Sequence, residues 1–584
     1  MQQFNWGLPY ITHRQSVMAQ NIVATSQPLA AQAGIRMLHE GGNAVDAAIA
    51  TAIALTVVEP TSNGLGSDSF ALIWNEDDGE LLGLNASGRS PKAWTYDHFS
   101  QYLDCGGKAG TSIGSMPRLG WDTVTVPGAV SAWVELSDRF GELKFEELFQ
   151  PAISYAKDGF PVSPITARVW ALAPEKYHGM SDFAKTFLPG GRAPLPGEIF
   201  RNTDLAHTLE RLSWSGGDSF YREDLADQIA DHAEKTGGLL TLEDLASHSA
   251  DWVEPISVDY HGLTLHEIPP NGQGIAALEM LGILEHSEFD PAEMALGSPD
   301  SLHLQIEAMK LALADADRYV SDPDTMDLPP RDLLSESYLR KRANLITMKK
   351  AQDPGYGTPD RSGTVYLTTA DESGMMVSYI QSNYMGFGSG IVVPGTGIAL
   401  QNRGTGFSLE KGHPNQVDGG KRPFHTIIPA FVTRGGGGEG TGSSGAKGTG
   451  HREAVMSFGV MGGPMQAQGH AQMMIRMFDH GQDPQTAIDA PRWQVFPDME
   501  VALEPGFGDD VASELARRGH RITREKEFWW YGGAQAICRL GRDGRSTRIS
   551  GKGENGNGDN KKGDNGIFYC SGSDSRKDGH AVGF

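Results

Sequence analysis

The chain has 584 residues, several times the usual size of one domain, so we expect two or more domains or one large multilayer unit. Hydrophobic residues make up 39% and charged residues 21%, as in an ordinary globular protein with a core. The net charge of -24 disfavours binding to nucleic acid or to an acidic membrane surface, because both carry negative charge.

The N-terminal sequence and the cysteines bear on the cellular compartment and on metal binding. Residues 1–20 contain no apolar stretch of secretory length, and the longest apolar run, residues 47–58, is too short to span a bilayer. Cys105, Cys538 and Cys570 form no C-x-x-C pair, so neither a structural zinc site nor a disulfide framework is indicated. We therefore expect a soluble, cytoplasmic protein without a metal or another cofactor.

The first half of the chain has mainly helical patterns. Residues 34–58 are rich in alanine and are interrupted by two glycines, after which Asn43 is a candidate N-cap for a buried helix. This helix should end before Pro60. A hairpin and three more helices are predicted from spacing and periodicity, in that order, over residues 69–84, 145–156, 204–212 and 301–319.

Beyond residue 354 the pattern changes to short strands. Residues 365–370 and 375–382 are β-rich and flank a polar turn, which indicates a hairpin. Further strands and then a helix are predicted over residues 391–393, 427–432, 455–459 and 466–479. This order favours sheets covered by helices on both outer faces. Two low-complexity segments, residues 435–450 and 551–566, are expected to be flexible surface insertions.

The Gly363-Thr364 step, at the start of a predicted strand, suits a nucleophile that cleaves its own chain. Glycine allows the strained backbone that exposes a carbonyl to attack. Threonine supplies a hydroxyl and, once the bond before it breaks, an α-amine that titrates near pH ~8 and can act as a general base. The step alone is a weak signal, because most such pairs are ordinary strand residues and five more occur, at Gly110-Thr111, Gly395-Thr396, Gly404-Thr405, Gly440-Thr441 and Gly448-Thr449.

Several short motifs, in a fixed order along the chain, give this step its context. They are GGNAVDAAIATAIALTVVEP at 41–60, VPG at 126–128, PAISYAKDGFP at 151–161, Glu307 to Lys310 followed by Asp317, PGTGI at 394–398 and KRP at 421–423. In this order they resemble the gamma-glutamyltransferase family. The resemblance covers nearly the whole chain and excludes only the two low-complexity segments.

The resemblance implies an α/β fold, the four-layer αββα sandwich of the N-terminal-nucleophile hydrolases. It also implies a proenzyme that is cut between Gly363 and Thr364 into a large subunit, residues 1–363, and a small catalytic subunit, residues 364–584. The two subunits would stay together, and such heterodimers could pair further. The new N-terminal Thr364 would attack an amide or γ-glutamyl substrate and form an acyl-enzyme, which water or an acceptor amine would release.

The resemblance assigns three more catalytic positions. Ser382 stands where the family has a second hydroxyl that binds the nucleophile, although a polar residue at a strand end would look the same. Gly462 and Gly463 match the family's glycine pair, whose backbone N–H groups form an oxyanion hole. This pair follows a predicted strand and precedes a helix, which fits that role better than an ordinary turn.

The residues expected to bind the acyl group depart from the family pattern. The arginine that binds a carboxylate is replaced by Ser87, although Arg89 lies two residues away. The other altered positions, which bind the substrate amine or amides in the family, are Tyr384, Arg403, Gly406, His425 and Thr426. Because a guanidinium favours a carboxylate and repels an ammonium, the acyl donor should carry a terminal carboxylate and no α-amine, unless Arg403 has only a structural role. These traits resemble the branch with acylase-like and oxamate-hydrolase-like members.

Two other readings remain. A metal-dependent hydrolase is disfavoured, because no H-x-x-x-H or H-E-x-x-H spacing occurs among the 18 histidines. A weakly active or inactive relative that only binds a ligand would have signalled itself by loss of Thr364 or of the glycine pair, and both are present.

Overall fold

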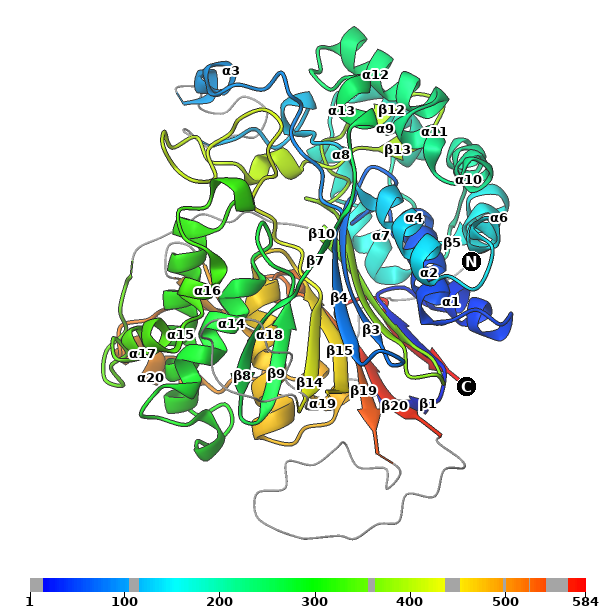
Figure 1. Cartoon of the computed structure of the whole chain (residues 1–584). Coiled ribbons are helices and arrows are strands. Elements are labelled where there is room, and N and C mark those ends of the chain that lie inside the picture. Colours follow the sequence, from blue (N-terminus) through cyan, green and yellow to red (C-terminus); the bar gives the residue numbers. More distant parts are fainter. Residues whose placement is uncertain are drawn as a thin grey trace.

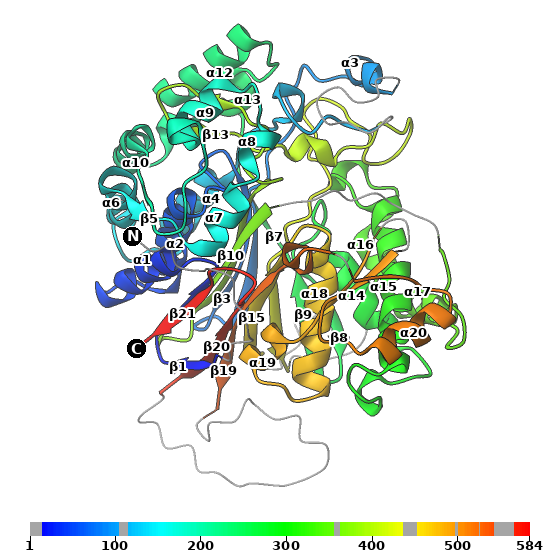
Figure 2. The same cartoon turned by 180° about the vertical axis from the view of Figure 1, so that it is seen from behind.

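Two seven-stranded antiparallel sheets lie face to face at the centre of the structure (Figure 1 and Figure 2). The computed structural model describes residues 14–103, 115–354, 363–435, 452–496, 500–524, 526–541 and 566–584. The two predicted low-complexity insertions lie outside these residues, apart from Gly435 and Gly566 at their ends.

Both sheets combine strands from the two halves of the chain. The first sheet has the order β21 (His580–Gly583), β2 (Ile22–Thr25), β10 (Gly363–Ala370), β11 (Met376–Tyr384), β3 (Asp68–Asn75), β4 (Glu80–Asn85) and β7 (Asp251–Val253). The second has the order β1 (Val17–Ala19), β20 (Phe568–Ser573), β19 (Gly533–Leu540), β15 (Glu453–Met461), β14 (Ala430–Arg434), β9 (Leu263–Glu267) and β8 (Ile256–Tyr260).

Helices cover the outer face of each sheet, which completes the predicted four-layer αββα sandwich (Figure 1). The first sheet is covered mainly by α1 (Pro28–His39), α2 (Ala44–Val58), α4 (Ala129–Phe140), α6 (Gln150–Asp158) and α10 (Thr203–Ser215). The second is covered by α14 (Gly274–Glu285), α18 (Met465–Met474) and α19 (Pro484–Asp489), and α15 (Pro299–Tyr319) packs on α14.

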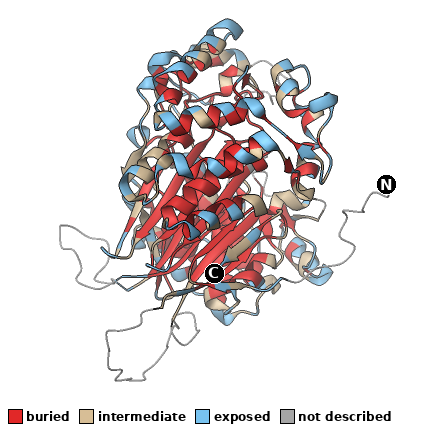
Figure 3. Ribbon diagram, turned by 90° about the vertical axis from the view of Figure 1, so that its right-hand side faces the viewer, coloured by how far each residue is buried: buried red, intermediate tan, exposed pale blue. Residues whose placement is uncertain are grey.

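Both faces of the central strands are buried, as the red strands in Figure 3 show. In β3, Phe70 and Leu72 point into the core between the sheets, whereas Ala71 and Ile73 belong to the core beneath α2. This division follows from the two-residue repeat of a strand. A strand buried on both faces therefore has a nearly continuous apolar sequence rather than an alternating one.

Most predicted elements are confirmed, with differences at their ends. The strand expected over residues 427–432 begins only at Ala430, because side chains bind the preceding backbone: the N–H of Ile428 donates to Gln466 Oε1 at 3.0 Å. The helix expected over residues 466–479 is α18, which continues as a π-helical turn over Ile475–Asp479. The C-terminal strands β19, β20 and β21 were not predicted.

Strands β10 and β15 pack against each other across the space between the sheets. A Cβ atom at Gly459 of β15 would lie 2.4 Å from the ring of Tyr366 in β10, so only glycine allows this approach. The hydroxyl of Thr368, two residues after Tyr366, is hydrogen-bonded to that of Ser457, two residues before Gly459. The strands therefore run in opposite directions, and the start of β10 meets the end of β15.

The buried helix α2 begins at a capping box. Asn43 Oδ1 accepts hydrogen bonds from the N–H groups of Val45 and Asp46, and Asp46 Oδ2 accepts one from the N–H of Asn43. Asn43 Nδ2 also donates to the carbonyl of Phe140 at 2.6 Å. Asn43 thus fixes the start of the helix that packs beneath β10 and β11.

Replacing Asn43 by alanine should destabilise the protein by about 1–2 kcal/mol, because the N-cap and the bond to Phe140 are both lost. The free energy of unfolding, measured by urea denaturation, checks this. Asn344→Ala, at an exposed helix end, is the control and should change it little. Equal stability of the two variants would contradict the role given to the capping box.

Candidate active site

Thr364 lies at the start of β10, where the pairing with β11 is irregular. Gly363 pairs with Tyr384, but the register shifts before Val365. The Thr364 side chain is buried, and its Oγ1 lies 3.2 Å from Ser382 Oγ. Ser382 Oγ also accepts the N–H of Tyr384 at 2.8 Å. The predicted nucleophile and second hydroxyl are therefore in contact.

The predicted glycine pair follows β15 and precedes α18. Gly462 and Gly463 have φ angles of 119° and 59°, which favour glycine. At Gly462 a Cβ atom would also approach Gly532 Cα to 3.0 Å. Since the start of β10 meets the end of β15, the pair is brought to the same rim as Thr364.

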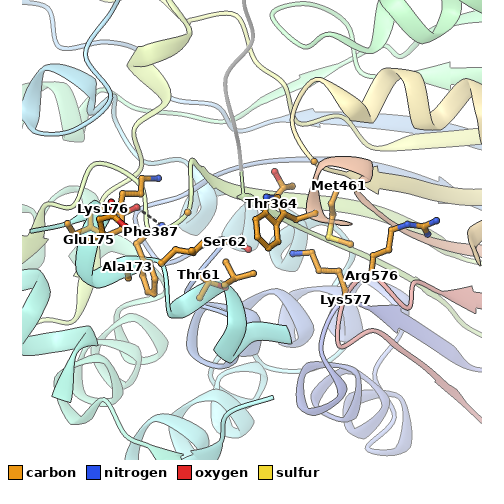
Figure 4. A pocket seen from close by; sticks show the side chains of 17 residues that line it. Thr61, Ser62, Ala173, Glu175, Lys176, Thr364, Phe387, Met461, Arg576 and Lys577 are labelled. Carbon is orange, nitrogen blue, oxygen red and sulfur yellow. Dashed lines mark hydrogen bonds between the residues drawn. The ribbon is translucent and has the colours of Figure 1, made fainter. Parts of the chain in front are cut away.

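Thr364 and Gly462 line one cavity of about 420 Å³. In Figure 4, Thr364 lies between Phe387 and Lys176 on one side and Met461 and Lys577 on the other. Much of the wall is apolar or aromatic, formed by Val169, Leu172, Phe387, Met461 and Trp529. Two of its cations are neutralised by acids: Lys577 pairs with Glu59 at 2.9 Å, and Arg576 with Glu504 and Asp574.

Arg403 is a buried cation with spare hydrogen-bonding capacity. Its Nη1 donates to Thr426 Oγ1 at 2.9 Å, and its guanidinium carbon lies 4.2 Å from the centre of the Tyr384 ring. Its Nε and Nη2 have no hydrogen-bond partner in the part of the chain that the structure describes. Burial lowers the pKa of Arg403 to about 10, against the opposing effects of Tyr384 and Asp68, so the group stays protonated at neutral pH.

His425 and Asp68 form a second buried pair beside Arg403. His425 Nε2 lies 3.2 Å from Asp68 Oδ2, and both side chains are fully buried. Burial, and then the cations of Arg403 and Arg422, hold the pKa of His425 well below its usual range, so the imidazole is neutral. Burial raises the pKa of Asp68 to about 7, although Arg403 and the N–H of Gly88 favour its ionised form.

Two residues of this region were not predicted. Asp68 pairs with Ser382 across β3 and β11, and a carboxylate at the first position of an apolar strand was the signal that could have revealed it. Gln273 Nε2 donates to the carbonyls of Thr426 at 2.6 Å and Gly463 at 2.8 Å. Gln273 thereby links Thr426, which binds Arg403, to Gly463 of the glycine pair. No pattern in the sequence indicated this contact.

Arg89 is placed differently from the other predicted binding residues. Its side chain is 42% exposed, and its Nη1 pairs with Asp322 Oδ2 at 2.9 Å. It also donates to the carbonyl of Gly420 at 3.3 Å. Ser87, which replaces the family arginine, instead donates to Asn85 Oδ1 at 2.7 Å. The structure thus brings together Tyr384, Arg403, His425 and Thr426 but engages Arg89 elsewhere.

The comparisons with known proteins fit this geometry. A sequence profile of gamma-glutamyltranspeptidase matches residues 30–583. The chain belongs to the gamma-glutamyltranspeptidase family. It is therefore a member of a family of hydrolases and acyl-transferring enzymes, as the motifs predicted. None of the helices within the described residues is long and apolar enough to cross a membrane.

Similar proteins lie in the predicted branch of this family. The chain is 35% identical to the oxamate amidohydrolase proenzyme of Klebsiella pneumoniae, over 88% of this chain and 94% of that protein. It is 33% identical to the glutathione hydrolase-like YwrD proenzyme of Bacillus subtilis, over 98% and 100%. The crystal structure of cephalosporin acylase from Bacillus halodurans superposes with a TM-score of 0.87 at 44% identity, covering 100% of this chain and 99% of that one.

Replacing Asp68 by asparagine should change how stability depends on pH. The pKa of Asp68 is about 7 in the fold against an ordinary 3.8, so between these values the folded state binds the extra proton. Its contribution to stability therefore falls as pH rises through this range. The free energy of unfolding of the variant minus that of the wild type should rise with pH, by at most about 1.4 kcal/mol per unit.

Urea denaturation at several pH values between about 4 and 7, the range in which the two states bind protons differently, measures this slope. Asp138→Asn, which removes an exposed carboxylate, is the control and should give a much smaller slope. A flat difference for Asp68→Asn would show that the carboxyl is not perturbed by burial.

Proposed function

We propose that this chain is a self-processing threonine amidohydrolase whose acyl donors carry a terminal carboxylate. The observation that carries the proposal is the contact of Thr364 with Ser382 on a cavity that also includes Gly462. Processing would begin with attack of Thr364 Oγ1 on the carbonyl carbon of Gly363. The peptide bond breaks as an ester forms, and water then hydrolyses this ester to give subunits of residues 1–363 and 364–584.

The same groups would act on a substrate amide. The free α-amine of Thr364, with a pKa near ~8, takes the proton from its own hydroxyl, and Ser382 donates to the developing alkoxide. Oγ1 then attacks the amide carbonyl, and the N–H groups of Gly462 and Gly463 stabilise the oxyanion. The amine leaves with a proton from the threonine ammonium. Water or an acceptor amine releases the acyl group.

The buried guanidinium supports a carboxylate-bearing acyl group. Arg403 keeps two donor atoms, Nε and Nη2, without a partner among the described residues, and a carboxylate would accept both hydrogen bonds. Asp68 could in principle attract an ammonium, but its carboxylate oxygens already face His425 and the N–H of Gly88. Two similar proteins are named as an oxamate amidohydrolase and a cephalosporin acylase, which is consistent with monoamides of dicarboxylic acids.

The cavity supports a bulky amine half of the substrate. Its wall includes Leu172, Phe387 and Trp529, whereas Arg403 and Thr426 are not among its lining residues. A substrate with its carboxylate at Arg403 would place its amine in this largely apolar space. γ-Glutamyl amides would also fit the cavity, but their α-amine would lie near the guanidinium and bind less well.

Intact mass of the purified protein under denaturing conditions tests the nucleophile. Wild type should give two fragments, the smaller beginning at Thr364, whereas Thr364→Ala should give one uncut chain. Thr364→Ser, which keeps a hydroxyl, should still be cut and is the matched control. A single wild-type chain without amidase activity would favour the alternative reading, a relative that binds a ligand without catalysis.

Arg403→Gln should change the choice of donor. With glutaryl p-nitroanilide, kcat/KM should fall about 100-fold, because a charged partner of the carboxylate is lost in a buried site. With γ-glutamyl p-nitroanilide the fall should be smaller, because the repulsion of its α-amine is also removed. Arg318→Gln, at an exposed ion pair, is the control. Equal losses for both donors would show that Arg403 has only a structural role.

A further inference from the structure

A cluster of titratable side chains lies outside the site, on the helix layer of the second sheet. His303, Glu307 and Lys310 follow one another on α15 at helical spacing, and His520 reaches them from the residue before β18 (Arg521–Thr523). All four side chains are buried. We call this group the Lys310 cluster.

The hydrogen bonds of the Lys310 cluster form a chain in which each group donates to the next, from Lys310 to the carbonyl of Thr347. Lys310 Nζ lies 2.8 Å from Glu307 Oε1 and 3.3 Å from His520 Nδ1, and an ammonium can only donate. His520 Nδ1 must therefore accept, so its hydrogen is on Nε2 and is donated to His303 Nδ1 at 2.7 Å. His303 Nε2 in turn donates to the carbonyl of Thr347 at 2.9 Å. Both imidazoles are neutral in this arrangement.

The cluster binds residues 347–352, which we call the tail segment. Lys310 Nζ donates to the carbonyl of Gln352 at 3.0 Å, and Glu307 Oε2 accepts the N–H of Gln352 at 2.9 Å. The N–H of Ala351 donates to the carbonyl of Arg518 at 2.7 Å. Both ends of the tail segment are thus fixed to α15 and to the chain after α20 (Asp509–Arg517).

Two imidazoles and a carboxylate within 4.8 Å of one another also form a donor set that zinc prefers. Here Lys310 already supplies a positive charge to this set, in contact with the carboxylate and one imidazole. The two rings are also bonded directly to each other, at 2.7 Å between His303 Nδ1 and His520 Nε2. The ammonium therefore takes the role that a metal ion would have.

We infer that the Lys310 cluster anchors the tail segment to α15, with the Lys310 ammonium in the place of a metal ion. Because the tail segment lies eleven residues before Gly363, the cluster would hold the upstream end of the chain that carries the proposed cut. This consequence rests on the proposed function, but the fastening itself does not. Acid should open it, since protonation of either imidazole removes an acceptor that the chain of bonds needs.

The charges around the two histidines give the sign of this pH dependence. Lys310 and Arg518 are the nearby cations; Glu307 is the nearby anion, and Asp300 and Glu514 lie further out as partners of Arg518. Burial, then Lys310, holds the pKa of His520 at about 3, and burial also lowers the pKa of His303. In an opened state both return to about 6.5, so opening should become easier as the pH falls below that value, by about tenfold per pH unit for His520.

Amide hydrogen exchange at Ala351 and Gln352, followed by mass spectrometry, tests this inference. It is measured on the wild type, on Lys310→Met and on Lys350→Met, and on the same three chains with Thr364→Ala, which removes the proposed nucleophile. Lys310→Met should exchange at least about tenfold faster at both amides, the change expected for the loss of one charged hydrogen bond. Lys350→Met, which alters an exposed lysine of the same segment, should match the wild type.

The outcomes separate this inference from the proposed function. Fast exchange in Lys310→Met supports it whether or not the chain is cut, because the Thr364→Ala background reports on the tail segment alone. If Lys310→Met does not fold, Glu307→Leu/Lys310→Met removes both charges together and should show the same fast exchange.

In the wild type, protection corrected for intrinsic exchange should fall below about pH 6.5, the ordinary pKa of histidine. Unchanged protection in the foldable variant, a flat wild-type pH series, or one bound zinc per chain by elemental analysis would each overturn the inference.

Discussion

The close packing of β10 against β15 is the constraint on which the site depends. Gly459 lets the Tyr366 ring lie against its backbone, so the two sheets pack closely at this point. Because the strands run in opposite directions there, the first residues of β10 and the residues after β15 share one rim. The Thr364 hydroxyl at the start of β10 and Gly462 after the end of β15 are thereby brought to the same cavity. A larger spacing between the sheets would separate them.

The polar groups behind this rim set the charge of the site, whereas the packing of the strands sets its geometry. Arg403, His425 and Asp68 are buried together, and their charges counteract one another without a direct Arg403–carboxylate hydrogen bond in the described structure. A buried cation with spare donors is costly in the empty protein, and a bound carboxylate would relieve that cost. This gives a physical reason why the proposed catalytic residues follow the family pattern while the neighbouring positions differ from it.

Much of the fold and part of the site could be predicted from the sequence. The resemblance to the family pointed to Thr364, Ser382 and Gly462, which lie together in the structure, and α2 has both its cap and its apolar length. Gln273 and the partnership of His303 with His520 could not be found in this way, because both depend on contacts between residues far apart in the chain. Asp68 left a signal, a carboxylate at the start of an apolar strand, but its contact with His425 could not be predicted from that signal. The strands β19 and β20 were missed because a long low-complexity segment interrupts the hairpin that they form.

The interleaving of the strands also limits when the protein can fold. In the first sheet, β2 lies between β21 and β10, and in the second, β1 has β20 as its neighbour. The first strands of the chain therefore cannot complete their pairing until the last strands have left the ribosome at the end of synthesis. A chain that stops short of β20 would leave β1 without its neighbour in one sheet and β2 without one of its two neighbours in the other, so neither sheet would be complete. The two sheets that hold the site would therefore be complete only after the whole chain has been made.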